Sequence, residues 1–162
     1  MPKKSRKKSR KSHALTHVDS RGRVKMVNIS EKPIVRRLAV AHADFIAKKE
    51  TLDLLERDHL PKGEALATAR IAAIAAAKRC DELIPLCHSL PLDAVDIDIT
   101  RAAKTRMRIQ AAVTTTAKTG VEMEALLAVS IAGLTLYDMC KAVDKTMRIE
   151  GIRLMKKIKS QM

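Results

Sequence analysis

Apolar and polar residues alternate strictly in two neighbouring stretches of the chain, residues 94–100 and residues 107–113. A period of two is typical of strands that bury one face. The polar stretch RAAKTR between them makes a hairpin plausible, although it lacks a strong two-residue turn signal. We expect the inward side chains of this hairpin to be Val95, Ile97, Ile99, Met107, Ile109, Ala111 and Val113.

A longer apolar stretch, residues 119–145, predicts a single helix. No proline interrupts it between Val121 and Val143, and apolar residues cover almost its whole circumference, which is typical of a helix buried on most sides. Thr119 and Glu122 have the spacing of a capping box at its start. We expect the rest of the chain to be organised around this helix.

Residues 34–45 predict a strand in which Val35, Leu38 and Val40 pack inward. Residues 48–60 then predict a short helix that ends before a proline.

An alanine-rich helix is predicted over residues 65–84, and a closing strand over residues 147–158 with an irregularity at Gly151. The elements therefore follow the order β, α, β, β, α, β, with the short helix inserted after the first strand. This order predicts a ferredoxin-like α+β fold, an antiparallel sheet with two long helices packed on one face.

The formal net charge is +14, and residues 3–11 alone hold seven Lys or Arg and no acid. We expect residues 1–14 to be a disordered basic arm, residues 15–158 to be a single domain, and residues 159–162 to be a short tail. The basic body suits a polyanionic partner, which is either a phosphorylated metabolite or nucleic acid.

Phe45 and Tyr137 are the only aromatic residues in the sequence. Ferredoxin-like sheets that bind RNA stack bases on aromatic side chains, so specific RNA recognition is disfavoured. Nonspecific nucleic-acid binding through the basic arm stays an alternative.

The cysteines Cys80, Cys87 and Cys140 are odd in number and lie in apolar segments. The sequence shows no secretory segment, and we judge no apolar run long enough to span a bilayer. We therefore expect reduced thiols in a cytoplasmic protein with no membrane partner.

Glu122, Glu124, Asp138 and Lys141 interrupt the long apolar helix, where carboxylates are costly unless they have partners. On a helix, Asp138, Lys141 and Lys145 share one face. Glu124 and Asp138 are fourteen residues apart, or ~21 Å along a helix axis. If both ends are functional, either the ligand is long or a second subunit contributes a helix end. The alternative is that Glu122 is only a cap and Asp138 and Lys141 form only a surface pair.

Three more residues are candidates for a site. His88 lies in a proline-bracketed loop, Lys62 precedes a predicted helix N-terminus that could meet a phosphate, and Arg36 lies inside a strand, where an arginine usually holds an anion. The alternatives are a structural histidine and an exposed lysine. The adjacent pair Cys87–His88 is a weak metal or nucleophile signal. Together the set suits general acid–base chemistry on a phosphorylated substrate.

Three motifs, DELIPLCHSLPL (residues 81–92), GVEMEAL (residues 120–126) and LYDMCKAVDK (residues 136–145), closely resemble the cyclic pyranopterin monophosphate synthase family, the accessory protein C family of molybdenum cofactor biosynthesis. The likeness runs over residues 15–157.

The resemblance implies a ferredoxin-like subunit in a homohexamer, a trimer of dimers with sites at subunit interfaces. It also implies a lyase that rearranges 3',8-cyclised dihydroguanosine triphosphate to cyclic pyranopterin monophosphate and releases pyrophosphate. No cofactor is implied beyond Mg²⁺ that can accompany the triphosphate, and no metal ligands are expected in the protein.

The family's site residues map onto this sequence by the same resemblance. The implied catalytic residues are Asp138, Lys62 and Lys141. The implied substrate-binding residues are Leu86, Cys87, His88, Met123, Glu124, Glu122, Arg36 and Lys157. We expect Arg36, Lys62 and Lys157 to hold the triphosphate, and His88 and Glu124 to bind the guanine-derived rings.

The sequence departs from the family pattern at Ser89, where proline is usual, and at Asn28, where aspartate is usual. Two alternatives follow: a catalytically weakened family member, or a basic oligomer that binds nucleic acid through its N-terminal arm.

Overall fold

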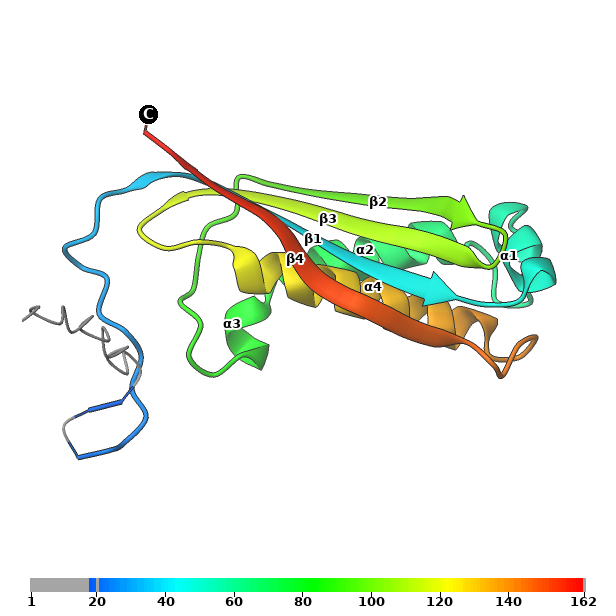
Figure 1. Cartoon of the computed structure of the whole chain (residues 1–162), viewed down its shortest axis with the longest axis horizontal. Coiled ribbons are helices and arrows are strands. Elements are labelled where there is room, and N and C mark those ends of the chain that lie inside the picture. Colours follow the sequence, from blue (N-terminus) through cyan, green and yellow to red (C-terminus); the bar gives the residue numbers. More distant parts are fainter. Residues whose placement is uncertain (1–17, 20, 162) are drawn as a thin grey trace, which may run out of the picture.

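One antiparallel sheet with helices on one face forms the protein in the computed structural model, which describes residues 18–19 and 21–161 (Figure 1). The predicted basic arm of residues 1–14 lies outside the described residues. The strands are ordered β2-β3-β1-β4, and α2 and α4 pack beneath them, so the predicted α+β fold is confirmed. The bounds are β1 Val35–Ile46, β2 Ala94–Ala103, β3 Arg106–Ala117 and β4 Arg148–Ser160 for the strands, and α1 Lys49–Glu56, α2 Ala65–Lys78, α3 Cys80–Leu83 and α4 Glu122–Cys140 for the helices.

The hairpin of β2 and β3 has the predicted inward face. Val113, Ala111 and Ile109 are fully buried and pair with Val95, Ile97 and Ile99. Alternation located this face because the large apolar residues of the hairpin fall on the same side of the pleat.

The prediction for β1 chose the wrong face at two positions. Ala39, Ala41 and Phe45 are buried against the helices, whereas Leu38 and Val40 lie on the opposite face and are half-buried. Small alanine side chains let the long helix approach the sheet closely, so alanines, and not Leu38 and Val40, face the helices in the middle of β1.

Two predicted helices end earlier than expected. Helix α1 ends at Glu56, and Asp58 then adopts a left-handed backbone with φ 54°, which stops the helix before Pro61. The alanine-rich helix ends at Lys78 as α2 and breaks at Arg79 before the single-turn α3.

The predicted capping box at the start of α4 is wrong. Val121 is the N-cap residue and no side chain caps the helix. A Cβ on Gly120 would clash with Glu122 Oε2, so the Glu122 carboxylate occupies the space beside the glycine backbone. Helix α4 ends at Cys140, and Lys145 therefore does not continue the helical face of Asp138.

Among the described residues, α4 is the one helix with the length and apolar composition to cross a membrane, which corrects the expectation that no such run exists. It packs against α2, β1, β3 and β4, and its buried positions include Ala125, Val129 and Leu136. It is therefore the core helix of the fold.

Strand β4 carries the predicted irregularity. Gly151 has φ 64°, and the pairing of β1 with β4 shifts register between His42 and Asp44, opposite this glycine. The strand continues to Ser160, two residues beyond its predicted end.

Candidate functional site

Helix α4 runs beneath the length of the sheet, so its two ends bring side chains to opposite ends of the molecule (Figure 1). The fourteen-position separation of Glu124 and Asp138 corresponds to ~21 Å of helix. We name the first group the cavity end, which consists of Leu86, Cys87, His88, Glu122, Met123 and Glu124. The second group is the lysine end, which consists of Lys62, Asp138 and Lys141.

At the lysine end, two ammonium groups hold one carboxylate. Lys62 Nζ lies 2.7 Å from Asp138 Oδ2 and 2.9 Å from the Asp138 carbonyl oxygen. Lys141 Nζ lies 2.7 Å from Asp138 Oδ1. The predicted surface pair therefore exists, and Lys62 joins it from a turn that is distant in the sequence.

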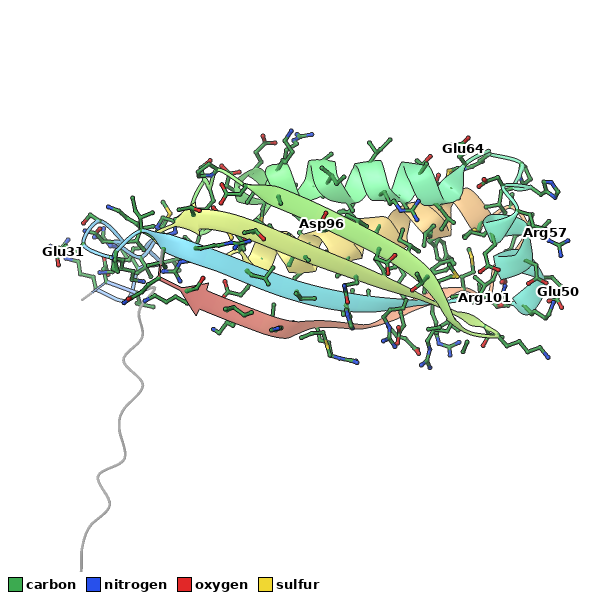
Figure 2. The ribbon with its side chains drawn as sticks, turned by 90° about the horizontal axis from the view of Figure 1, so that it is seen from above. Glu31, Glu50, Arg57, Glu64, Asp96 and Arg101 are labelled. Carbon is green, nitrogen blue, oxygen red and sulfur yellow. The ribbon has the colours of Figure 1, made fainter. Side chains whose placement is uncertain are left out.

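These contacts lower the pKa of Asp138 to about 2, through the hydrogen bond from Lys141 first and that from Lys62 second. The pKa of Lys141 is raised by its hydrogen bond to Asp138. All three side chains are between 38% and 56% exposed, so a bound anion can reach them. Lys62 lies two positions before Glu64, the N-cap residue of α2, which Figure 2 labels.

At the cavity end, six of the eight residues that sequence reasoning assigned to substrate binding gather around one cavity of about 440 Å³. They come from two segments, the loop after α3 and the first turn of α4. The members that line this cavity are Leu86, Cys87, His88, Glu122, Met123 and Glu124.

Glu124 is 4% exposed. Burial raises the pKa of its carboxyl, and the nearby charges of Glu122 and Asp81 add to the rise. A buried carboxyl in a cavity wall is costly to ionise unless a ligand supplies hydrogen-bond donors. Glu124 is therefore suited to bind a group that carries N–H donors.

The loop that carries His88 is fixed by side-chain hydrogen bonds. His88 Nε2 lies 2.9 Å from the Val27 carbonyl oxygen, and because a carbonyl only accepts, Nε2 carries the proton. The Ser89 hydroxyl donates to Asp81 Oδ2 at 2.5 Å.

The cysteine of the cavity is no activated nucleophile. Burial raises the pKa of the Cys87 thiol, and burial raises that of Cys80 to about 12. Thiols in such surroundings stay protonated at neutral pH. Cys80, Cys87 and Cys140 are all free thiols, as expected.

A second cavity of about 280 Å³ shares Gly120 and Glu122 with the first. Lys157 lines it, and its Nζ lies 3.5 Å from Glu122 Oε1. Arg37 also lines it and donates to the carbonyl oxygens of Ala117 and Lys118. This cavity therefore adds positive charge next to the first one.

Arg36 is not brought to either cavity of its own chain. It precedes Arg37 in β1, so it points to the opposite face of the sheet, where it is exposed. Its assignment to the substrate stays a prediction.

Sequence reasoning missed several lining residues. Val27, Ile29 and Lys32 cover the first cavity from the segment before β1, and Arg37 was passed over for Arg36. The alternation of residues 23–29 was a signal for extended backbone, but nothing in it indicated which surface that segment would cover.

Comparisons with known proteins show which sequences this chain is similar to. The MoaC family profile matches residues 26–160. The cyclic pyranopterin monophosphate synthase 1 of Mycobacterium tuberculosis (strain ATCC 25618 / H37Rv) is 54% identical over 144 residues, which cover 89% of this chain and 85% of that protein. The synthase of Roseiflexus castenholzii is 53% identical over 88% of this chain and 91% of its own length, and that of Thermomicrobium roseum is 51% identical over 88% and 87%.

Proposed function

Since the chain belongs to the MoaC family, we propose that it is a cyclic pyranopterin monophosphate synthase of molybdenum cofactor biosynthesis. The reaction is the rearrangement of 3',8-cyclised dihydroguanosine triphosphate to the cyclic pyranopterin monophosphate, with release of pyrophosphate. The observation that carries the proposal is the single cavity that collects Leu86, Cys87, His88, Glu122, Met123 and Glu124.

The cavity end suits the guanine-derived rings. The buried carboxyl of Glu124 gains hydrogen-bond donors when a guanine N–H edge enters, which offsets the cost of its ionisation. His88, which lines the same cavity, provides a further hydrogen-bonding group. Lys157 and Lys32 supply positive charge at the margin for phosphate oxygens.

The lysine end suits the charge changes of the reaction. Lys62 and Lys141 stabilise the negative charge that develops as pyrophosphate departs. Asp138 has a low pKa and is therefore a carboxylate in the resting protein. When a phosphate competes for the lysines, the pKa of Asp138 rises, and the carboxylate becomes able to accept a proton during ring opening.

The two ends of one α4 lie ~21 Å apart, so one subunit does not place both around one nucleotide. We propose that a second subunit contributes its lysine end to the cavity end of the first, within a homohexamer built as a trimer of dimers. Arg36 would then reach the triphosphate of a neighbouring subunit. No resident cofactor is proposed, and Mg²⁺ would bind the triphosphate itself. The proposed location is the cytoplasm.

A mixing experiment tests this proposal. Glu124→Gln protein and Asp138→Asn protein, each with low activity at substrate concentrations well below the wild-type KM, are unfolded together, refolded and assayed under that condition for pyrophosphate release. Shared sites restore about one quarter of the wild-type rate, because half of randomly paired dimers are mixed and one of their two sites is intact. No restoration would contradict shared sites, while wild-type protein that releases no pyrophosphate would contradict the function.

Nucleic-acid binding through residues 1–14 stays the alternative. A binder of that kind loses affinity steeply as salt rises and after deletion of the arm, whereas pyrophosphate release from the cyclised nucleotide does not depend on the arm.

A further inference from the structure

A second carboxylate beyond the end of α4 is more deeply buried than Asp138. Asp144 is 2% exposed and accepts four hydrogen bonds. Its Oδ2 accepts from Lys48 N at 2.9 Å and from the Thr51 hydroxyl at 3.1 Å. Its Oδ1 accepts from the backbone N–H and the hydroxyl of Thr146, both at 2.8 Å.

These bonds compensate the charge without a cation, since no salt bridge within residues 18–19 and 21–161 includes Asp144. Burial opposes ionisation, yet the donors from Lys48, Thr146 and Thr51 lower the pKa of Asp144 to about 2. A buried carboxylate with four neutral donors is held in one position, because each oxygen has two partners.

Asp144 joins two segments that are far apart in the sequence. Lys48 is the N-cap residue of α1, and it makes no side-chain cap of its own, so Asp144 caps this helix from 96 residues away. On the other side, Asp144 N donates to Cys140 O, the last residue of α4, at 3.1 Å. Asp144 therefore links the start of α1, through its carboxylate, to the end of α4, through its backbone N–H.

Both segments lead directly to the lysine end. Helix α1 is followed by the turn that carries Lys62, and the last turn of α4 carries Asp138 and Lys141. Lys62 Nζ touches both the side chain and the main chain of Asp138, so its place is defined in two directions.

Elsewhere, α1 is held by Arg101 at the end of β2. Arg101 lies 2.8 Å from Asp53 and 2.7 Å from Glu56 (Figure 2 labels Arg101 beside α1). These two acids lie in the later turns of α1, so Arg101 anchors the helix to the β2–β3 hairpin and leaves its N-terminus to Asp144.

We infer that Asp144 is a positioning residue of the proposed reaction, which sets Lys62 against Asp138 by clamping the start of α1 to the end of α4. This inference rests on the proposed function and deepens it. Asp144 touches no cavity residue and moves no proton. It acts through Lys62, so its removal should matter only while Lys62 is present.

The test is a double-mutant cycle of Asp144→Asn and Lys62→Ala, in which the rate of pyrophosphate release is measured. Asp144→Asn turns an amide group toward a pair of donors and releases one side of the clamp. We expect kcat to fall roughly 10- to 100-fold, the size of effect expected from a misplaced catalytic group. In a Lys62→Ala background, Asp144→Asn should lower kcat no further. An equal loss in both backgrounds would overturn the inference and leave Asp144 a structural residue.

A second readout does not require turnover. In Asp144→Asn protein, the pKa of Asp138 should rise from about 2 toward its ordinary value of 3.8, as followed by carboxyl NMR titration. The same rise is expected in Lys62→Ala protein, with no further rise in the double variant. An unchanged Asp138 pKa in the Asp144→Asn protein would overturn the inference even if the wild-type protein proved inactive.

Two controls separate positioning from loss of stability. Ile109→Val removes one buried methylene from β3 and should lower the melting temperature while kcat stays at the wild-type value. Thr51→Val removes one of the four bonds and should lower kcat less than Asp144→Asn, whereas Thr51→Ser keeps the hydroxyl and should keep kcat. Should Asp144→Asn fail to fold, Thr51→Val decides the question by the same Asp138 titration and Lys62→Ala comparison.

Discussion

The carboxyl groups at the two ends of α4 have pKa values that are shifted in opposite directions. At the cavity end, Glu124 is buried, and burial raises its pKa. At the lysine end, Asp138 is more than half exposed, and hydrogen bonds from Lys141 and Lys62 lower its pKa to about 2. One helix thus carries a carboxyl that is hard to ionise and a carboxylate that is hard to protonate.

This difference shows how one scaffold prepares two kinds of recognition. At the cavity end, Glu124 has too few hydrogen-bond donors to stabilise its charge. A ligand that brings N–H groups therefore stabilises this end most. At the lysine end, two ammonium groups surround the single carboxylate of Asp138. A ligand that brings phosphate therefore stabilises this end most. Under the proposed function, a substrate with both guanine-derived rings and a triphosphate would contact both ends only at an interface between two subunits.

The largest expected effect is at the lysine end. Asp138→Asn should lower kcat by about 10²- to 10⁴-fold, the range of general acid–base catalysis, because the amide cannot accept the proton. The melting temperature should change little, since the side chain is exposed. Pyrophosphate release under saturating substrate measures the effect. Asp98→Asn, at an exposed position on β2, is the matched control and should retain full turnover. A fully active Asp138→Asn protein would remove the lysine end from the mechanism.

At the cavity end we expect a smaller effect that is mainly on KM. Glu124→Gln should raise KM roughly 10- to 100-fold, because a charge-assisted hydrogen bond contributes about 1.5–3 kcal/mol. The wild-type KM should also rise as pH falls below the raised pKa of Glu124, and the KM of the variant should lose this dependence. Initial rates across a pH series measure both, and a parallel pH dependence in the two proteins would argue against a role for Glu124.

Glu124→Gln should also change the thermal stability of the protein. Since the folded-state pKa of Glu124 lies above its ordinary value of 4.5, its contribution to stability is present at low pH and is lost as pH rises through the folded-state pKa. Glu124→Gln should therefore melt at a higher temperature than wild type at neutral pH, and the gap should close toward pH 4. Thermal melts across this range test the sign.

The smallest effect is expected beside the cavity end. Gly120→Ala places a Cβ where the Glu122 carboxylate lies, so the flexible glutamate side chain must move away from Lys157. An exposed pair of this kind contributes roughly 0.2–1 kcal/mol, which corresponds to about a 1.4- to fivefold rise in KM. Steady-state kinetics with Glu122→Gln as a comparison would show whether the two changes have the same consequence. A Gly120→Ala protein with wild-type KM would show that Glu122 needs no fixed position.

Much of the fold follows from local pattern. Strict alternation located β2, β3 and their inward faces, and the long apolar stretch located α4. The face of β1 was assigned wrongly because hydrophobicity favoured Leu38 and Val40, whereas helix packing favoured the small residues between them. The start of α4 was assigned wrongly because threonine is a residue type favoured at helix N-caps, whereas Val121 is the N-cap residue in the structure.

The sequence by itself determined the order of the elements, the apolar faces of the hairpin and the residue types that suit a phosphorylated nucleotide, because these depend on neighbours within a few positions. Only the tertiary structure decided that Lys62 meets Asp138, that Val27 holds His88, and that Asp144 fastens α1 to α4. Each of these contacts joins residues at least 61 positions apart, and no local spacing encodes where a sheet and its helices bring distant turns together.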